Sequence, residues 1–120
     1  MKYVLDSHTH TIASGHAYST LHEMAKAASD KGLELLGITE HSMRMPGTCH
    51  EYYFQNMRIL PREMYGIEVM HGAEVNIMDL NGSLDMKQEL LEKMDVVVAS
   101  MHTPCLKAGS RQENTHAFIE

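Results

Sequence analysis

Short apolar runs alternate along this chain with segments in which apolar residues recur three and four positions apart. The apolar runs predict four β-strands, at residues 3–6, 33–39, 67–75 and 95–100. The last run contains three consecutive valines, and its β-branched residues predict a strand that is buried on both faces. Because helical patterns lie between these runs, the alternation predicts an α/β fold with a parallel sheet covered by helices.

Helix signals fill the segments between the predicted strands. Thr20 and Glu23 have the spacing of a capping box, and they predict a helix that ends at Gly32. Residues 51–64 also favour a helix, which Pro61 is expected to kink or divide. The first two predicted strands are therefore joined by a helix, as is usual for a parallel connection.

The second half of the chain continues this alternation. An Asn-Gly pair at 81–82 predicts a hairpin turn within a small β-excursion at residues 76–85. Residues 85–94 favour a helix that is capped by its first residue, an aspartate. Ser110 and Glu113 form a second capping-box pattern, which predicts a last helical segment through position 119. The chain is therefore expected to contain about four βα units.

Four βα units that stop without a helix C-cap are typical of part of a barrel or of an open sheet. The chain has 120 residues, which is room for one domain. We therefore expect a fragment, a cleaved species, or a chain that completes its sheet with a partner. A free edge on the last parallel strand would favour self-association through that edge.

The charge balance argues against two classes of partner. Lys and Arg number 10 and Asp and Glu number 16, so the net charge is −6 with His neutral. General binding to nucleic acid or to an anionic membrane needs a basic surface, so we expect neither as a partner. No apolar run approaches the roughly 18–20 residues of a membrane span, and no signal-peptide core precedes the first histidines, so a cytoplasmic location is expected. Cys49 and Cys105 are too few for a disulfide framework.

Histidine is the residue type that points to chemistry, with nine copies in the chain. Six side chains that can bind metal lie at the carboxyl end of a predicted strand or in the loop after it: His8, His10, His16, His41, Glu74 and His102. The carboxyl ends of parallel strands share one edge of a sheet, where α/β proteins build their sites. His8 and His10 lie on one side of an extended segment, roughly 7 Å apart. A multinuclear metal site at this rim is predicted.

Four further histidines are interpreted as structural or solvent-exposed residues rather than ligands: His22, His50, His71 and His116. His71 lies three residues before Glu74, so on a strand it is expected to face the outer helices. Asp6 and Glu40 are candidates to accept the second ring N–H of a metal-bound histidine.

Several short motifs together resemble the first four motifs of the PHP (polymerase and histidinol phosphatase) family. They are Asp6-Ser-His8-Thr-His10, His16, Ile38-Thr-Glu40-His41, Gly72-Ala-Glu74 and Ser100-Met-His102. The runs His16-Ala-Tyr-Ser-Thr-Leu21, Asn56-Met-Arg-Ile59 and Glu74-Val-Asn-Ile77 resemble its bacterial phosphatase subgroup in particular. The resemblance covers essentially the whole chain.

The resemblance implies a distorted seven-stranded parallel β/α barrel with three divalent metal ions at its C-terminal rim. By this resemblance His8, His10 and Glu74 bind one ion, and Glu74 bridges to a second ion that His102 also holds. His16 and His41 would hold the third. The family takes further ligands from later strands and is about twice this length. Residues 1–120 are therefore expected to be the N-terminal part of a single PHP-type domain. Glu40 departs from the aspartate that is more usual in the family before that histidine.

The expected activity is metal-dependent hydrolysis of a small phosphorylated substrate, a phosphomonoester, by a metal-bridging hydroxide rather than by a protein nucleophile. Glu74 is the predicted bridging residue, and zinc is the expected metal, with manganese or iron as alternatives. Arg58 or Arg62 could add positive charge for the substrate, or could be solvated helix residues. The other functions left open are an amidohydrolase-type metal hydrolase and a catalytically incomplete metal-binding fragment.

Overall fold

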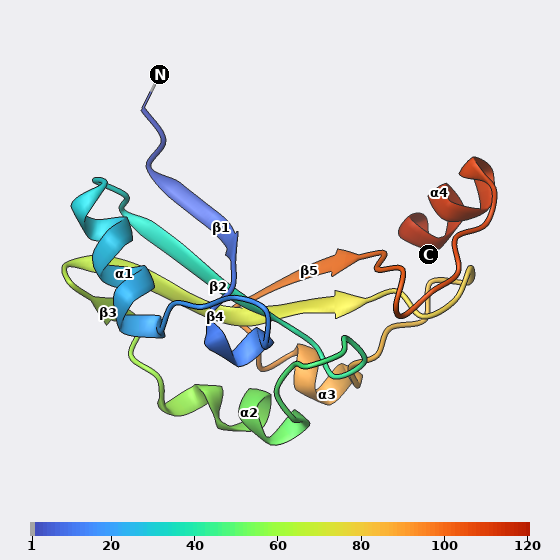
Figure 1. Cartoon of the computed structure of the whole chain (residues 1–120), viewed down its shortest axis with the longest axis horizontal. Coiled ribbons are helices and arrows are strands. Elements are labelled where there is room, and N and C mark those ends of the chain that lie inside the picture. Colours follow the sequence, from blue (N-terminus) through green and yellow to red (C-terminus); the bar gives the residue numbers. More distant parts are fainter. Residues whose placement is uncertain (1) are drawn as a thin grey trace.

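The computed structural model describes residues 2–120, and a curled parallel sheet forms the centre of the fold (Figure 1). Its four parallel strands are β1 (Leu5–Thr9), β2 (Leu35–His41), β4 (Ile67–Asn76) and β5 (Val96–Ser100). A short strand, β3 (Glu63–Met64), pairs antiparallel with the start of β4, whose last five residues pair with β5 on the same side. The strand order is β1-β2-β4-β3, with β5 also on β4, so β4 is the central strand.

Helical segments follow the strands, and all but the last of them pack against the sheet. They are η1 (Ile12–Ser14), α1 (Leu21–Asp30), α2 (Glu51–Asn56), η2 (Met57–Ile59), α3 (Gln88–Leu91) and α4 (Arg111–Ile119). Figure 1 shows α2 and α3 below the sheet and α4 set apart beyond the end of β5. This arrangement confirms the α/β fold class and the four βα units of a partial β/α barrel. Among residues 2–120, no helix combines the length and apolarity that crossing a membrane demands.

The first strand lies further along the chain than the apolar run predicts. Tyr3 is 76% exposed, and β1 instead runs through the polar residues from Asp6 to Thr9. Tertiary hydrogen bonds explain the shift, because the Thr9 hydroxyl donates to the Gly37 carbonyl at 2.7 Å. His8 consequently lies inside the strand rather than after it.

A β-bulge interrupts the pairing of β1 with β2. Asp6 pairs with Leu36 and Thr9 pairs with Ile38. Between these pairs β1 advances by three residues while β2 advances by two, so β1 contains one extra residue. The position between those partners on β2 is Gly37, where a Cβ atom would lie only 2.6 Å from the carbonyl oxygen of Ser7. Glycine therefore lets the bulge approach β2 closely, and the extra residue sets the directions of the histidines that follow.

Two apolar clusters form the core between the sheet and its helices. The first joins α1 to β2, β3 and the start of β4: Ala25, Ala28, Leu36, Ile38, Met64, Ile67 and Val69. The second lies under α2, η2 and α3: Phe54, Met57, Ala73, Val75, Met86 and Leu90. Since side chains alternate along a strand, the residues between these positions on β2 and β4 face the opposite, inner side of the sheet.

Local signals predicted the helix starts more accurately than the helix lengths. Both capping boxes form, at Thr20 with Glu23 and at Ser110 with Glu113. The predicted helix at 51–64 is wrong in its second half, because helical structure ends at residue 59 before Pro61 and the chain then enters β3. The hairpin between β3 and β4 was not predicted from the sequence.

Two further expectations for the second half of the chain are wrong. The helix predicted for 85–94 is limited to α3, and its N-cap is Lys87, because the Asp85 carboxylate accepts hydrogen bonds from elsewhere in the fold. β5 is not buried on both faces, since Val97 is 40% exposed on this outer strand. The β-excursion at 76–85 is confirmed as a single antiparallel bridge between Ile77 and Leu84.

Candidate metal centre

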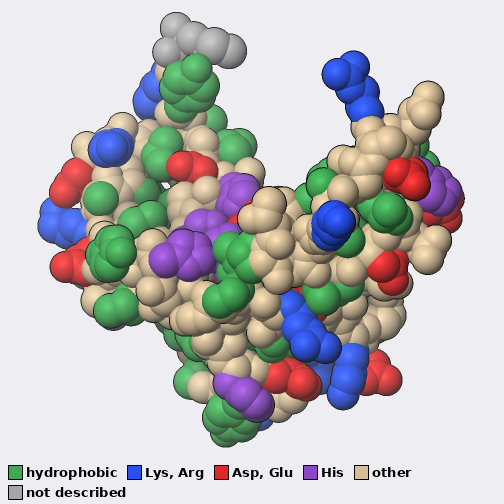
Figure 2. Space-filling model, turned by 45° about the vertical axis from the view of Figure 1, so that its right-hand side comes forward, with side chains coloured by type: hydrophobic (Ala, Val, Ile, Leu, Met, Phe, Trp, Pro, Cys, Tyr) green, Lys and Arg blue, Asp and Glu red, His purple; other side chains and the backbone are tan. Residues whose placement is uncertain are grey.

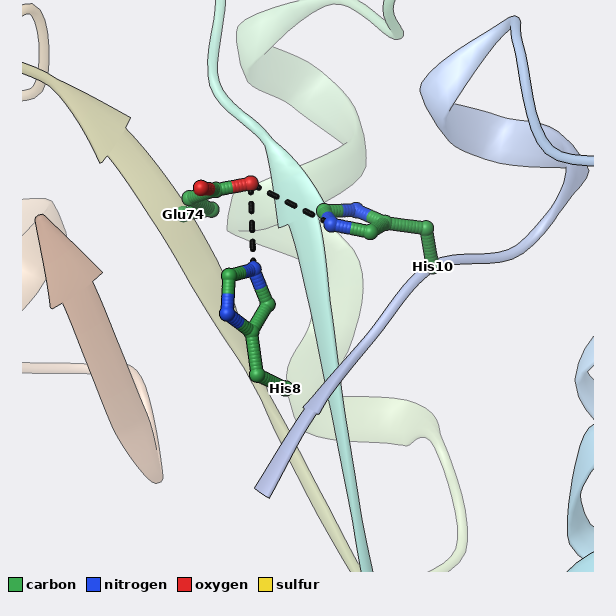
Figure 3. A group of neighbouring side chains, drawn as sticks. All are labelled: His8, His10 and Glu74. Carbon is green, nitrogen blue, oxygen red and sulfur yellow. Dashed lines mark ion pairs between the residues drawn. The ribbon is translucent and has the colours of Figure 1, made fainter. Parts of the chain in front are cut away.

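The carboxylate of Glu74 lies at the centre of four imidazoles. Its Oε2 atom is 3.2 Å from Nε2 of His8, 3.2 Å from Nε2 of His10 and 3.0 Å from Nδ1 of His41. Its Oε1 atom is 3.3 Å from Nε2 of His102. Figure 3 shows the imidazoles of His8 and His10 converging on this carboxylate from the segment that carries β1. We call these five residues the Glu74 cluster.

The parallel register of the sheet assembles the Glu74 cluster. Glu74 and His41 are direct register partners on β4 and β2, and His102 follows β5 on the other side of β4. His8 comes from β1, next to β2. The prediction that these side chains meet at the carboxyl ends of neighbouring strands is therefore confirmed. The cluster lies on the inner side of the sheet, opposite the apolar core.

Burial varies across the cluster. Glu74 and His41 are buried, whereas His10 and His102 are part-buried and His8 is exposed. Figure 2 shows histidine side chains gathered on one face of the molecule. The centre of the cluster is therefore shielded, while its outer imidazoles remain accessible to a small molecule.

The His10 imidazole is oriented by a buried hydroxyl. Its Nδ1 atom lies 3.2 Å from Oγ of Ser14. That hydroxyl donates to the buried carboxylate of Glu40 and accepts the backbone N–H of His41 at 2.9 Å. Since the hydroxyl proton is used by Glu40, Nδ1 of His10 carries the proton of their contact and Nε2 presents its lone pair to Glu74. Ser14 was not identified from the sequence.

The lone pairs of Nε2 of His10 and Oε2 of Glu74 face each other, and these two atoms are 3.2 Å apart, so a cation fits between them. Burial lowers the pKa of His10 despite the opposing attraction of Glu74 and Glu40, so the ring is neutral at pH 7. The contact is therefore not an ion pair between a protonated imidazole and the carboxylate. Ligand atoms about 2.0–2.1 Å from a tetrahedral zinc ion lie roughly 3.3 Å from each other. The contacts around Glu74 have this spacing.

His41 gives a second indication that the site fits a metal ion. Burial, followed by the nearby His10, lowers the pKa of His41 to about 4. Its buried Nδ1 atom has no hydrogen-bond partner among the described residues, although it faces Glu74. A buried polar atom without a partner is costly, and a metal bond would satisfy it.

The charge of Glu74 suits it to hold cations. Burial disfavours its ionised form, but hydrogen bonds from Ser100 and His8 hold the pKa of the carboxyl below its usual range. Two groups of three potential ligands share this carboxylate: His8, His10 and Glu74, and His41, Glu74 and His102. Glu74 can therefore bridge two ions, one in each group.

His16, the remaining predicted ligand, lies at the margin of this arrangement. Its ring centroid is 4.6 Å from that of His41, while the His10 ring stacks on His41 at 4.2 Å. His16 is exposed and belongs to neither group that includes Glu74. It adjoins the cluster through the ring of His41.

The four histidines interpreted as structural lie outside the Glu74 cluster. His22 contacts the Tyr65 hydroxyl, His50 caps α2, and His116 lies on α4. His71 is buried and its Nε2 atom lies 2.9 Å from the Pro61 carbonyl oxygen, on the helix-covered side of the sheet.

Asp6 and Glu40, the two acids predicted to accept a hydrogen bond from a site histidine, make different contacts. Asp6 contacts the backbone N–H of His8 at 3.3 Å and no imidazole among the described residues. Glu40 is fully buried and accepts from Thr11 and Ser14, so it reaches His10 only through the Ser14 hydroxyl. Asn76, which sequence reasoning missed, contacts His102 directly, with 2.7 Å between Oδ1 and Nδ1. Its signal was available, since it lies two residues after Glu74 and thus on the same face of β4.

Neither arginine proposed for substrate binding adjoins the cluster. Arg62 forms an ion pair with Asp95 at 2.9 Å and donates to the carbonyls of Met57 and Leu60. Asp95 immediately precedes β5, so this pair lies at the amino end of the sheet, away from the Glu74 cluster. Arg58 lines a groove between α2 and α3 in the outer helical layer. Of the two alternatives left open for these arginines, the one that places positive charge at the site is wrong for this part of the chain, and Arg58 is an exposed helical residue, as in the other alternative.

Comparison with known proteins gives one consistent family. The model of the PHP domain family matches residues 6–119. The chain is 52% identical over 119 residues to a "Probable phosphatase" of Clostridium novyi (strain NT), covering 99% of this chain and 49% of that protein. A "Probable phosphatase" of Acetivibrio thermocellus is 49% identical, and one of Clostridium botulinum (strain Langeland) is 46% identical, each with the same coverage. The chain thus spans about half the length of the curated relatives it matches.

Proposed function

Because this chain belongs to the PHP domain family, we propose that its Glu74 cluster binds divalent metal ions for the hydrolysis of phosphoesters. The proposed substrates are small phosphomonoesters, in keeping with relatives that are named probable phosphatases. Residues 1–120 would then be the N-terminal part of a single catalytic domain.

One observation carries the proposal, namely a single carboxylate within 3.0–3.3 Å of four imidazole nitrogen atoms. His8 and His10 would share one ion with Glu74, and His41 and His102 a second. His16, whose ring adjoins that of His41, would contribute to a third ion, since the neutral His41 ring has one lone pair and gives it to the second. Histidine-rich sites of this kind suit zinc, with manganese or iron as alternatives.

Bound divalent ions would supply Lewis-acid charge to the phosphoryl oxygens and activate water for attack on phosphorus. The protein's own side chains keep the donor atoms in place for this chemistry. Glu74 contributes the negative charge at the centre, and burial keeps His10 and His41 neutral and therefore able to donate lone pairs. No side chain of the cluster is proposed to attack the substrate.

The open sheet suggests how the chain could complete its site. Within residues 2–120, the outer edges of β1 and β5 have no neighbouring strand. We propose that further strands, from a longer chain or from a second copy through the β5 edge, supply the ligands that this half of the domain lacks. Sedimentation of the chain with and without zinc would distinguish a monomer from such an assembly.

Glu74→Gln tests the proposal because it removes the shared carboxylate charge while keeping the side-chain shape. We expect the metal content per chain, measured by elemental analysis, to fall by at least one ion, and hydrolysis of p-nitrophenyl phosphate to be lost. Glu68→Gln is the matched control, since Glu68 is an exposed glutamate on the same strand, about 20 Å away by strand rise. Full metal content in Glu74→Gln would refute the proposal, and turnover of an amide or carboxylic ester in preference to the phosphomonoester would favour an amidohydrolase-type activity.

A further inference from the structure

Asn76 connects a site histidine to a part-buried acid. It lies on β4 two residues after Glu74 and is fully buried. Its side-chain Oδ1 is 2.7 Å from Nδ1 of His102, and its Nδ2 is 2.6 Å from Oδ2 of Asp85. A single amide thus joins the imidazole on one side to a carboxylate on the other.

The Asp85 carboxylate determines which way the amide points. If the amide were turned over, its oxygen would face a carboxylate oxygen at 2.6 Å, and two acceptors cannot bond. In the observed orientation Nδ2 donates to Asp85 and also lies 3.3 Å from the hydroxyl oxygen of Ser42. The oxygen of Asn76 is therefore the atom presented to His102.

Asp85 itself is held by four donors. Its carboxylate accepts from the Ser42 hydroxyl, from the backbone N–H of Arg44 at 3.0 Å, and from the backbone N–H of Asn76 at 2.8 Å, in addition to the Asn76 amide. These bonds come from the loop after β2 and from the end of β4, so the acid cannot turn without breaking contacts to two elements. A carboxylate has about four acceptor positions, and all are used.

We infer that Asn76, oriented by Asp85, is a positioning residue that holds neutral His102 with its proton on Nδ1. The amide oxygen can only accept, as can the Glu74 carboxylate on the other side of the ring, but the contact with Asn76 at 2.7 Å is much the shorter of the two, so it takes the single proton of the neutral ring. A neutral imidazole has one such proton, which leaves a lone pair on Nε2, 3.3 Å from Oε1 of Glu74. This inference rests on the proposed function only in assigning that lone pair to a metal ion.

The inference predicts a measurable preference even without metal. In the metal-free chain with ¹⁵N-labelled histidine, long-range ¹H–¹⁵N spectra at pH 8 should show His102 protonated on Nδ1. Asn76→Ala should remove this preference and weaken zinc binding about 10–100-fold, the usual cost of losing a partner of a metal-bound histidine. Asn76→Asp retains an acceptor oxygen, so it should retain the Nδ1 proton although it places a second carboxylate beside Asp85. Asn56→Ala, at an exposed asparagine of α2, is the matched control.

The outcomes separate this inference from the proposed function. His102 protonated on Nε2 in the unaltered chain would overturn the inference without any variant, as would an unchanged tautomer in folded Asn76→Ala. If the tautomer and the zinc affinity change as expected but the chain with zinc hydrolyses no phosphoester, the role of Asn76 stands and the proposed function fails. A general loss of folding in Asn76→Ala leaves the spectrum of the unaltered chain and that of Asn76→Asp as the deciding measurements.

Discussion

His41 and Glu74 are register partners on adjacent parallel strands, and Nδ1 of the imidazole lies 3.0 Å from Oε2 of the carboxylate. Direct pairing makes the distance between these two groups a property of the sheet rather than of a loop. Among residues 2–120 the same imidazole atom is buried without a hydrogen-bond partner, and a bound metal ion would satisfy it.

His41→Leu should therefore raise the stability of the metal-free chain while weakening its metal binding. Removing a buried, unsatisfied nitrogen from the metal-free chain should raise its free energy of unfolding by about 1 kcal/mol. The extra stability that zinc confers should decrease, because one ligand is lost. Urea unfolding with and without zinc measures both effects, and His22→Leu on the exposed side of α1 is the control. Zinc stabilisation equal to that of the unaltered chain would rule out His41 as a ligand.

Ser14→Ala tests the contact that orients His10. The substitution deprives the buried Glu40 carboxylate of a hydrogen bond and deprives His10 of its acceptor. We expect a loss of about 2 kcal/mol in the free energy of unfolding, as is typical for a hydrogen bond to a charged group. Zinc affinity should also fall about 10–100-fold. Ser29→Ala removes an exposed hydroxyl bonded to the Tyr65 carbonyl and should affect stability by less than about 1 kcal/mol, with no change in zinc affinity.

Gly37→Ala tests the close approach of the β1 bulge to β2. The added Cβ atom would lie 2.6 Å from the Ser7 carbonyl oxygen, so β1 must move. We expect a destabilisation of more than about 2 kcal/mol, and weaker zinc binding because His8 and His10 move with the strand. Gly32→Ala is the control, since its φ of 77° strains an alanine while nothing lies within 4 Å of the new atom. It should cost about 1–2 kcal/mol and leave zinc binding intact. Equal zinc affinity in both variants would contradict a role for the bulge in positioning the ligands.

The metal-free chain should lose stability on mild acidification. Burial lowers the pKa of His10, of His41 and of His71 below the ordinary value of 6.5. Between the folded and unfolded pKa values the unfolded chain binds more protons, so stability rises with pH. The contribution of these histidines is therefore complete above about pH 6.5 and is lost as the pH falls towards 4, the value for His41.

Urea midpoints in a chelating buffer at pH 8, 6.5 and 5 measure this dependence. The midpoint should fall most between pH 6.5 and 5, and His41→Leu should reduce the fall. Lowered carboxyl pKa values at Glu74 and Asp95 act in the same direction but below about pH 4.5, outside this window. A midpoint that is constant from pH 8 to 5 would show that the imidazoles are not kept neutral by burial.

Much of the candidate site could be predicted because it depends on strand ends. Histidines that follow apolar runs must meet if the runs pair in parallel, and four of the five predicted histidines surround Glu74. The helix starts at Thr20 and Ser110 were also predictable, since a capping box involves residues only three positions apart. Periodicity and capping patterns are local, and these features follow from local chemistry.

The features that were missed depend on tertiary partners. Asp85 has the residue type of a helix cap, but Ser42 and Asn76 occupy its carboxylate, so α3 starts later. β1 runs through polar residues because pairing with β2, rather than apolar character, selects its register. The partners of Asp85 lie 9 and 43 residues away along the chain, beyond the reach of any local pattern.

Because β4 is the central strand, opening of the Glu74 cluster is coupled to cooperative unfolding of the whole sheet. One face of this strand carries Glu74 and Asn76, while the other carries the core residues Val69, Ala73 and Val75. Any fluctuation that exposes the β4 amides to solvent must therefore also disrupt the Glu74 cluster. At a metal concentration of 100 times Kd, such openings would cost about 2.7 kcal/mol more. Hydrogen exchange of the β4 amides should consequently report the occupancy of the site without any substrate.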